Sequence, residues 1–64
     1  MKFKIGDTVR IINRTCKYFD RVGTVQEVMA GQQLPFGLSG LESVPIWFGP
    51  HELILAEHQT EEPR

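Results

Sequence analysis

The chain has 64 residues, of which 41% are hydrophobic and 23% are charged. These proportions are typical of folded globular domains, and the length allows one domain with a single hydrophobic core. The isoelectric point near 6.0 does not favour a dedicated nucleic-acid-binding protein, because such proteins are usually strongly basic. The longest uninterrupted apolar run has only four residues, whereas a membrane-spanning helix needs roughly 18.

The ends of the chain and its single cysteine set further expectations. Residues 1–7 lack the apolar core and cleavage site of a secretory signal, so we expect a cytoplasmic protein. Cys16 is the only cysteine and cannot form an internal disulfide or a thiolate metal site. We expect the domain to span residues 1–57. The polar segment 58–64 has no apolar residue to anchor it and is predicted to be a disordered tail.

Short β-branched runs separated by Gly, Pro, Asn and Asp predict an all-β fold. In chain order, the expected elements are strands at 8–13, 22–29 and 44–48, a 3₁₀ turn at 50–53 and a strand at 54–56. Pro45 marks the third of these strands as an edge strand, because proline cannot donate to a neighbouring strand. With a further short strand in the long loop at 30–43, these elements predict a single SH3-like barrel of about five short antiparallel strands.

Alternation within the strands predicts which side chains face the core. In the first strand, Val9 and Ile11 are expected to point inward. In the second strand, Val25 and Val28 are three positions apart, so both point inward only if a bulge interrupts the alternation near residues 26 and 27. Small barrels use such bulges to curve.

Several motifs recur in known small barrels: Gly6 to Ile12 (GDTVRII), Tyr18-Phe19, Val22 to Val28 (VGTVQEV) and, near the end, Phe48, Glu52 and Leu53. Together they resemble PsaE, the small SH3-like subunit on the stromal or cytoplasmic face of photosystem I. The sequence is also similar to two other small barrels of oxygenic phototrophs, the NdhS subunit of the NADH-dehydrogenase-like complex and the variable chain of ferredoxin-thioredoxin reductase.

The resemblance implies a short cyanobacterial protein without a cofactor, which assists ferredoxin-linked electron transfer by docking. Its implied partner is ferredoxin or a subunit of a photosynthetic complex, and its implied place is the cytoplasmic face of the thylakoid membrane. The long loop at 31–43 comes earlier in the chain than the long loop of PsaE. The resemblance therefore implies this docking role and not membership of photosystem I itself.

Basic residues gather near the first predicted loop. Residues 1–30 contain six Lys or Arg and three Asp or Glu, a net charge of +3, whereas residues 31–64 have one basic and five acidic residues, a net charge of −4. We expect four of the basic side chains to form a cationic rim that attracts an acidic partner: Arg10, Arg14, Lys17 and Arg21. The alternative is that these charges belong to ordinary solvated faces.

Aromatic residues provide the remaining candidate contacts with a partner. Tyr18 and Phe19 are adjacent in the first loop, so one of them is expected to be partly exposed; alternatively, Phe19 closes the end of the barrel and Tyr18 covers it. Alternation places Trp47 on the outer surface, where an indole can anchor a partner. The apolar loop at 34–41, which contains the candidate contact residue Phe36, either folds over Trp47 or remains open as an interface.

Catalytic patterns are lacking in the sequence. His51 and His58 have no nearby cysteine or paired acid, and Cys16 has no implied base. We therefore expect neither an enzyme nor a cofactor or metal site. The leading prediction is a protein-binding accessory module. The alternatives are an RNA-binding barrel similar to KOW domains and an oligomer formed through the loop at 34–41.

Overall fold

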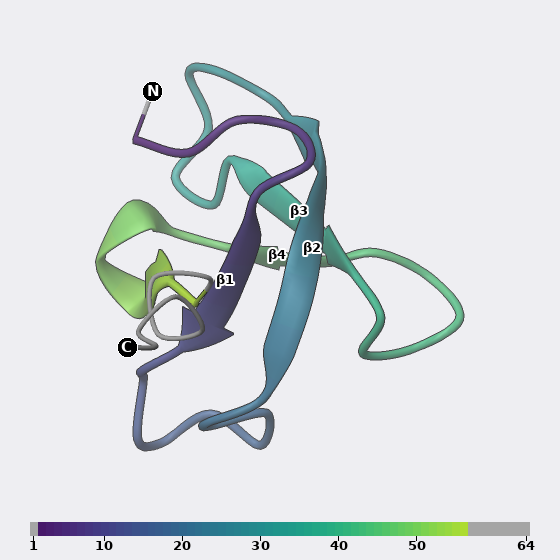
Figure 1. Ribbon diagram of the computed structural model, residues 1–64. Helices are drawn as coiled ribbons and strands as arrows, with labels where there is room; N and C mark the ends of the chain where they lie inside the picture. The colour runs from purple at the N-terminus through teal and green to yellow at the C-terminus, as the bar shows by residue number, and fades with distance from the viewer. Residues whose placement is uncertain (1, 57–64) are drawn as a thin grey trace, which may run out of the picture.

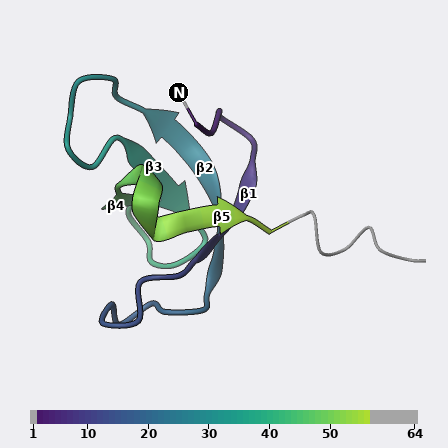
Figure 2. The same ribbon diagram turned by 90° about the vertical axis from the view of Figure 1, so that its left-hand side faces the viewer.

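The computed structural model describes residues 2–56 and shows one five-stranded antiparallel sheet. Figures 1 and 2 show its elements, which in chain order are β1 (Thr8–Ile11), β2 (Val22–Val28), β3 (Phe36–Ser39), β4 (Ile46–Phe48), the 3₁₀ helix η1 (Pro50–Glu52) and β5 (Leu53–Leu55). The strand order is β4-β3-β2-β1-β5, so η1 links the two edge strands. This architecture confirms the predicted all-β, SH3-like barrel. The predicted tail at 58–64 and the domain end at 57 lie outside the described residues.

The strands differ from their predicted bounds at the ends. The first strand stops at Ile11, and two residues later Asn13 begins a turn in which its Oδ1 accepts the Thr15 N–H at 3.0 Å. The further strand expected inside the long loop is β3, which lies between β2 and β4. β4 is shorter than predicted and is an edge strand, as Pro45 indicated.

The core lies on the concave side of the sheet. Val9 and Ile11 are fully buried, as alternation predicted. The register between β2 and β3 shifts between Val25 and Glu27, which confirms the predicted bulge. Because of this bulge, Val25 is buried and Val28 also packs against the core. The other buried hydrophobic residues are Phe3, Phe36, Leu38, Leu41, Phe48, Leu53 and Ala56.

The segment before β1 closes one end of this core. Phe3 is buried, and its ring meets that of Phe36 edge to face, with 5.2 Å between the ring centroids. A turn then reverses the chain: the Asp7 N–H donates to the Lys4 carbonyl at 3.0 Å, and Gly6 adopts a φ of +99°, which favours glycine. Within residues 2–56, no helix is both long and apolar enough to cross a membrane.

Candidate functional site

The loop at 12–21, here called the basic loop, joins β1 to β2 and is built from successive tight turns. The backbone N–H groups of Cys16, Phe19 and Arg21 each donate to the carbonyl three residues earlier, at 2.9–3.0 Å. At the end of the loop, Asp20 has a φ of +70°. Aspartate tolerates this left-handed conformation better than most residues, so the loop can turn directly into β2.

Hydrogen bonds hold the basic loop against the rest of the barrel. The Ile12 N–H donates to the Glu52 carbonyl at 2.8 Å, and the Asn13 amide donates to Glu52 Oε2 at 2.8 Å. The Asp20 N–H donates to the Ile11 carbonyl at 2.8 Å. The loop is thus attached to both η1 and β1, and its side chains are presented from a fixed backbone.

Three cations of the basic loop have no carboxylate partner among residues 2–56: Arg14, Lys17 and Arg21. Two of them lie over aromatic rings. The Arg14 guanidinium is 5.7 Å from the centroid of Phe19, and Lys17 Nζ is 5.2 Å from that of Tyr18. Both distances are within the range of cation–π attraction. The loop therefore presents positive charge and aromatic surface together.

Arg10 is placed differently from the other three predicted rim residues. It points to the outer face of β1, as predicted, but its Nη1 donates to the Asp20 carbonyl at 3.0 Å and lies 3.2 Å from Asp20 Oδ1. Only 31% of its side chain is exposed. Arg10 therefore fastens the end of the basic loop to β1, and Asp20 offsets part of its charge.

The structure resolves which of the two adjacent aromatics is exposed. Phe19 is 42% exposed, whereas Tyr18 is half-buried and meets the buried Phe48 edge to face. The Tyr18 hydroxyl donates to Glu42 Oε2 at 2.7 Å, and this hydrogen bond raises the pKa of Tyr18. One exposed aromatic was predicted correctly, but the alternative in which Phe19 closes the barrel is wrong.

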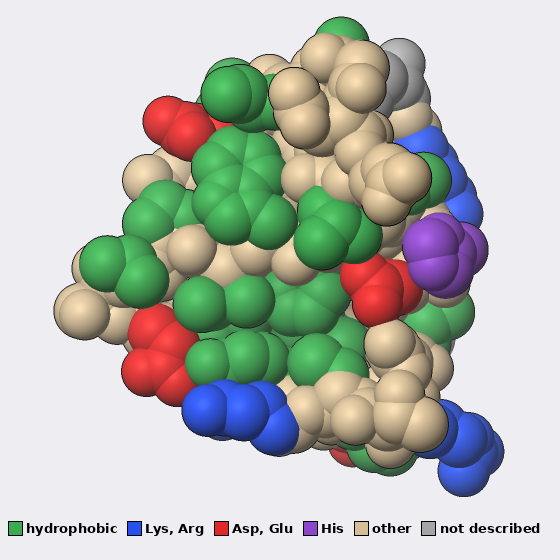
Figure 3. Space-filling view, turned by 180° about the vertical axis from the view of Figure 1, so that it is seen from behind, with side chains coloured by type: hydrophobic (Ala, Val, Ile, Leu, Met, Phe, Trp, Pro, Cys, Tyr) green, Lys and Arg blue, Asp and Glu red, His purple; other side chains and the backbone are tan. Residues whose placement is uncertain are grey.

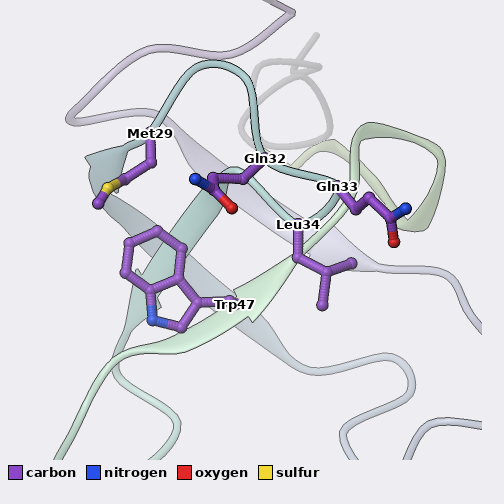
Figure 4. A pocket seen from close by; sticks show the side chains of 5 residues that line it. All are labelled: Met29, Gln32, Gln33, Leu34 and Trp47. Carbon is purple, nitrogen blue, oxygen red and sulfur yellow. The ribbon is translucent and has the colours of Figure 1, made fainter.

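A second candidate surface is an open pocket of about 490 Å³ beside Trp47. Figure 4 shows its lining side chains, which come from β4 and from the chain between β2 and β3: Met29, Gln32, Gln33, Leu34 and Trp47. Met29 and Leu34 are about half exposed. Figure 3 shows hydrophobic side chains gathered on one face of the molecule, with acidic and basic groups at its border.

Trp47 lies on the outer face of β4, as alternation predicted, because Ile46 and Phe48 pack on the core side. Its ring rests on the backbone of Gly37 in β3. A Cβ at that glycine would lie only 3.1 Å from two ring atoms, Cζ2 and Cη2. The missing side chain therefore allows the indole to lie flat, and Trp47 is half-buried with one side accessible from the pocket.

The prediction that Phe36 contacts a partner is wrong. Phe36 is fully buried, because its pairing with Phe48 and Val28 places it on the core side of the sheet. Leu38 and Leu41 are also buried, and of the apolar residues in the loop at 34–41 only Leu34 is substantially exposed. The loop therefore does not offer an open apolar side for pairing two copies of the chain.

The basic loop and the Trp47 pocket are separate surfaces. The basic loop enters β2 at Val22, whereas the chain that lines the pocket leaves β2 after Val28, at the opposite end of the strand (Figure 1). Seven residues of extended strand span roughly 20 Å. The basic loop does reach β4 through Tyr18 and Phe48, but Phe48 points away from the face that carries Trp47.

Groups with catalytic or metal-binding chemistry are not clustered in the described part of the chain. No three His, Cys, Asp or Glu side chains among residues 2–56 are placed to hold a metal ion. His51 is exposed on η1. Cys16 is half-buried, and its Sγ accepts the Tyr18 N–H at 3.4 Å. His58 lies outside the described residues.

Sequence patterns did not identify Met29, Gln32 or Gln33 as neighbours of Trp47, whereas Leu34 belongs to the loop at 34–41 that one of the two predicted arrangements folds over Trp47. The signal that could have found them is the β2–β3 pairing, in which Val28 lies opposite Phe36 and the Met29 N–H donates to the Pro35 carbonyl at 2.9 Å. No protein-family model matches the sequence, and no curated protein matches it significantly. The function therefore has to follow from the geometry of the two surfaces.

Proposed function

We propose that this protein is a non-catalytic protein-binding module whose basic loop docks an acidic partner protein. The proposal rests on three exposed cations of the basic loop that have no carboxylate partner among residues 2–56: Arg14, Lys17 and Arg21. Arg14 lies 5.7 Å from the centroid of the exposed Phe19 ring, and Lys17 lies over the neighbouring Tyr18 ring. Arginine and aromatic side chains are enriched among the residues that contribute most binding energy at protein interfaces.

The attachment of the loop favours docking on physical grounds. A loop that is already ordered loses little conformational entropy when a partner binds, so more of the contact energy appears as affinity. The hydrogen bonds from Ile12 and Asn13 to Glu52 supply this order. The exposed cations then act mainly on the rate of encounter with an acidic surface.

The resemblance to small barrels of oxygenic phototrophs supports a more specific form of the proposal. In it, the acidic partner is ferredoxin or a subunit of a photosynthetic electron-transfer complex, and the protein works at the cytoplasmic face of the thylakoid membrane. The protein supplies no cofactor of its own in this role. It positions an electron carrier by charge and by contact with Phe19.

The test is a binding titration with purified ferredoxin at low and high salt. We expect binding at low ionic strength that weakens as salt rises, because the Debye length is about 10 Å at 0.1 M and shortens further above it. Lys17→Gln should weaken binding several-fold, whereas the matched Lys2→Gln, outside the loop, should not. If ferredoxin does not bind at low salt, the ferredoxin assignment is wrong; if Lys2→Gln and Lys17→Gln behave alike, the loop is not the docking site.

RNA binding is the second candidate function, and the Arg14–Phe19 pair is the observation that favours it. An exposed ring with a guanidinium 5.7 Å from its centroid suits stacking on an unpaired base and contact with the adjacent phosphate. A mobility-shift assay with single-stranded and structured RNA tests this alternative. Tight binding that falls steeply with salt and is lost in Phe19→Leu would replace the protein-docking proposal.

A further inference from the structure

The outer face of the sheet beside the Trp47 pocket carries an acidic residue in register with the indole. Glu27 of β2 pairs with Gly37 of β3, and Gly37 pairs with Trp47 of β4. Residues directly opposite one another in antiparallel strands point to the same side, so these three positions form one row on the outer face. Glu27 is exposed.

Gly37 allows the two ends of this row to approach each other. Because Gly37 has no side chain, the Trp47 ring extends across β3, and its far atoms Cζ2 and Cη2 lie over the glycine. The benzene end of the indole is therefore directed toward β2, where Glu27 lies. Met29, two residues further along, leaves β2 on the same face and borders the ring (Figure 4).

The chemistry of the pocket favours a positively charged ligand. Its lining consists of an indole, a thioether, a leucine and two amides, and no basic residue is among them. The face of an indole attracts cations, and the side-chain carbonyl of Gln32 can accept a hydrogen bond from an ammonium or guanidinium group. Figure 4 shows the Gln32 amide beside the benzene end of Trp47 and the Gln33 amide directed away from it.

We propose that this pocket binds a lysine or arginine side chain of a partner protein, with the cation over Trp47 and beside Glu27. Charge complementarity supports this occupant, since the exposed carboxylate of Glu27 lies in the row that ends at Trp47 and none of the lining residues is basic. The inference does not rest on the basic loop. That loop is at the other end of β2 and carries the opposite charge.

The experiment uses Trp47 as its own reporter, because it is the only tryptophan in the chain. The full-length protein is titrated with short capped glycine peptides that contain one central arginine, lysine, glutamine or glutamate. We expect the arginine and lysine peptides to change Trp47 fluorescence in a saturable way and to shift its indole N–H resonance. The glutamine and glutamate peptides should leave both signals unchanged.

Matched variants show whether the cation is recognised at this row. Glu27→Gln should weaken binding of the arginine peptide about two- to fivefold, the range expected for loss of an exposed charge pair. Glu42→Gln removes the same charge away from the pocket and should have no effect. The proposal is overturned if no peptide shifts the indole resonance, if the glutamine peptide binds as well as the arginine peptide, or if both variants weaken binding equally. None of these outcomes affects the ferredoxin titration.

Discussion

The burial of Phe36 predicts a specific loss of stability in the variant Phe36→Leu. Phe36 is fully buried and meets Phe3 edge to face at 5.2 Å. Replacing the ring with a smaller aliphatic group leaves unfilled space and removes the aromatic pair, which should cost roughly 1–2 kcal/mol. A 64-residue domain has a total stability of only about 3–10 kcal/mol. Phe36→Ala, at about 3–5 kcal/mol, would leave little folded protein.

Urea denaturation followed by Trp47 fluorescence measures this effect. With a slope of about 1 kcal/mol per molar urea for so small a domain, the midpoint of Phe36→Leu should fall by roughly 1–2 M. The same substitution at the exposed Phe19 is the control, and Phe19→Leu should stay within about 0.5 kcal/mol of the original protein. A double-mutant cycle with Phe3→Leu should give a coupling energy of about 0.5–1.5 kcal/mol.

The refuting result is equally specific. If Phe36→Leu and Phe19→Leu shift the midpoint by the same small amount, Phe36 does not belong to the core and the pairing that turns it inward is wrong. A coupling energy near zero would show that the Phe3 ring does not meet Phe36, and the N-terminal segment would then not close the core as described.

Three further predictions follow from local contacts. Gly23→Ala should cost about 1–3 kcal/mol in urea denaturation, because its Cβ would lie 2.9 Å from the Ser39 carbonyl oxygen; an unchanged midpoint would contradict that close approach. The hydrogen bond from the Lys4 backbone N–H lowers the pKa of Asp7 below its ordinary value of 3.8. The stabilisation contributed by the ionised Asp7 carboxylate is therefore present above pH 3.8 and should be lost as the pH falls through the lowered pKa. Relative to Asp7→Asn, the original protein should lose stability only in acid. The hydrogen bond to Glu42 raises the pKa of Tyr18 above 10.0. Tyr18 is the single tyrosine of the chain, so an absorbance titration should show its pKa returning toward 10.0 in Glu42→Gln. An unchanged titration would exclude the hydrogen bond.

The strands were predictable because their signals are local. Alternation in β1 fixed the inward positions of Val9 and Ile11, and the spacing of Val25 and Val28 required the bulge that the register shows. Strand ends were less predictable. The side chain of Asn13 starts a turn soon after Ile11, and such side-chain hydrogen bonds compete with strand pairing without changing the hydrophobic pattern.

The basic loop shows where local signals are insufficient. The sequence places Tyr18 and Phe19 side by side and cannot decide which one packs inward. That choice depends on Glu42, which is 24 residues away and accepts the Tyr18 hydroxyl, and on Phe48, which meets its ring. A phenol can satisfy both a buried ring contact and an exposed carboxylate, whereas a phenylalanine at the same place would leave that carboxylate without this hydrogen bond.

The Trp47 pocket depends on register even more strongly. Alternation alone predicts that Trp47 points outward. The pairing of Gly37 with both Trp47 and Glu27 is also needed, because it places the indole over the glycine backbone and the acidic Glu27 in the same row. A slip of one residue between β2 and β3 would put Leu38 or Phe36 opposite Glu27, and an inward-facing side chain would replace the glycine in the row. The bulge after Val25 prevents this slip, because it lets Val25 and Val28 both contribute to the core while Glu27 stays outside. The same irregularity that curves the sheet thus also determines the charge beside the pocket.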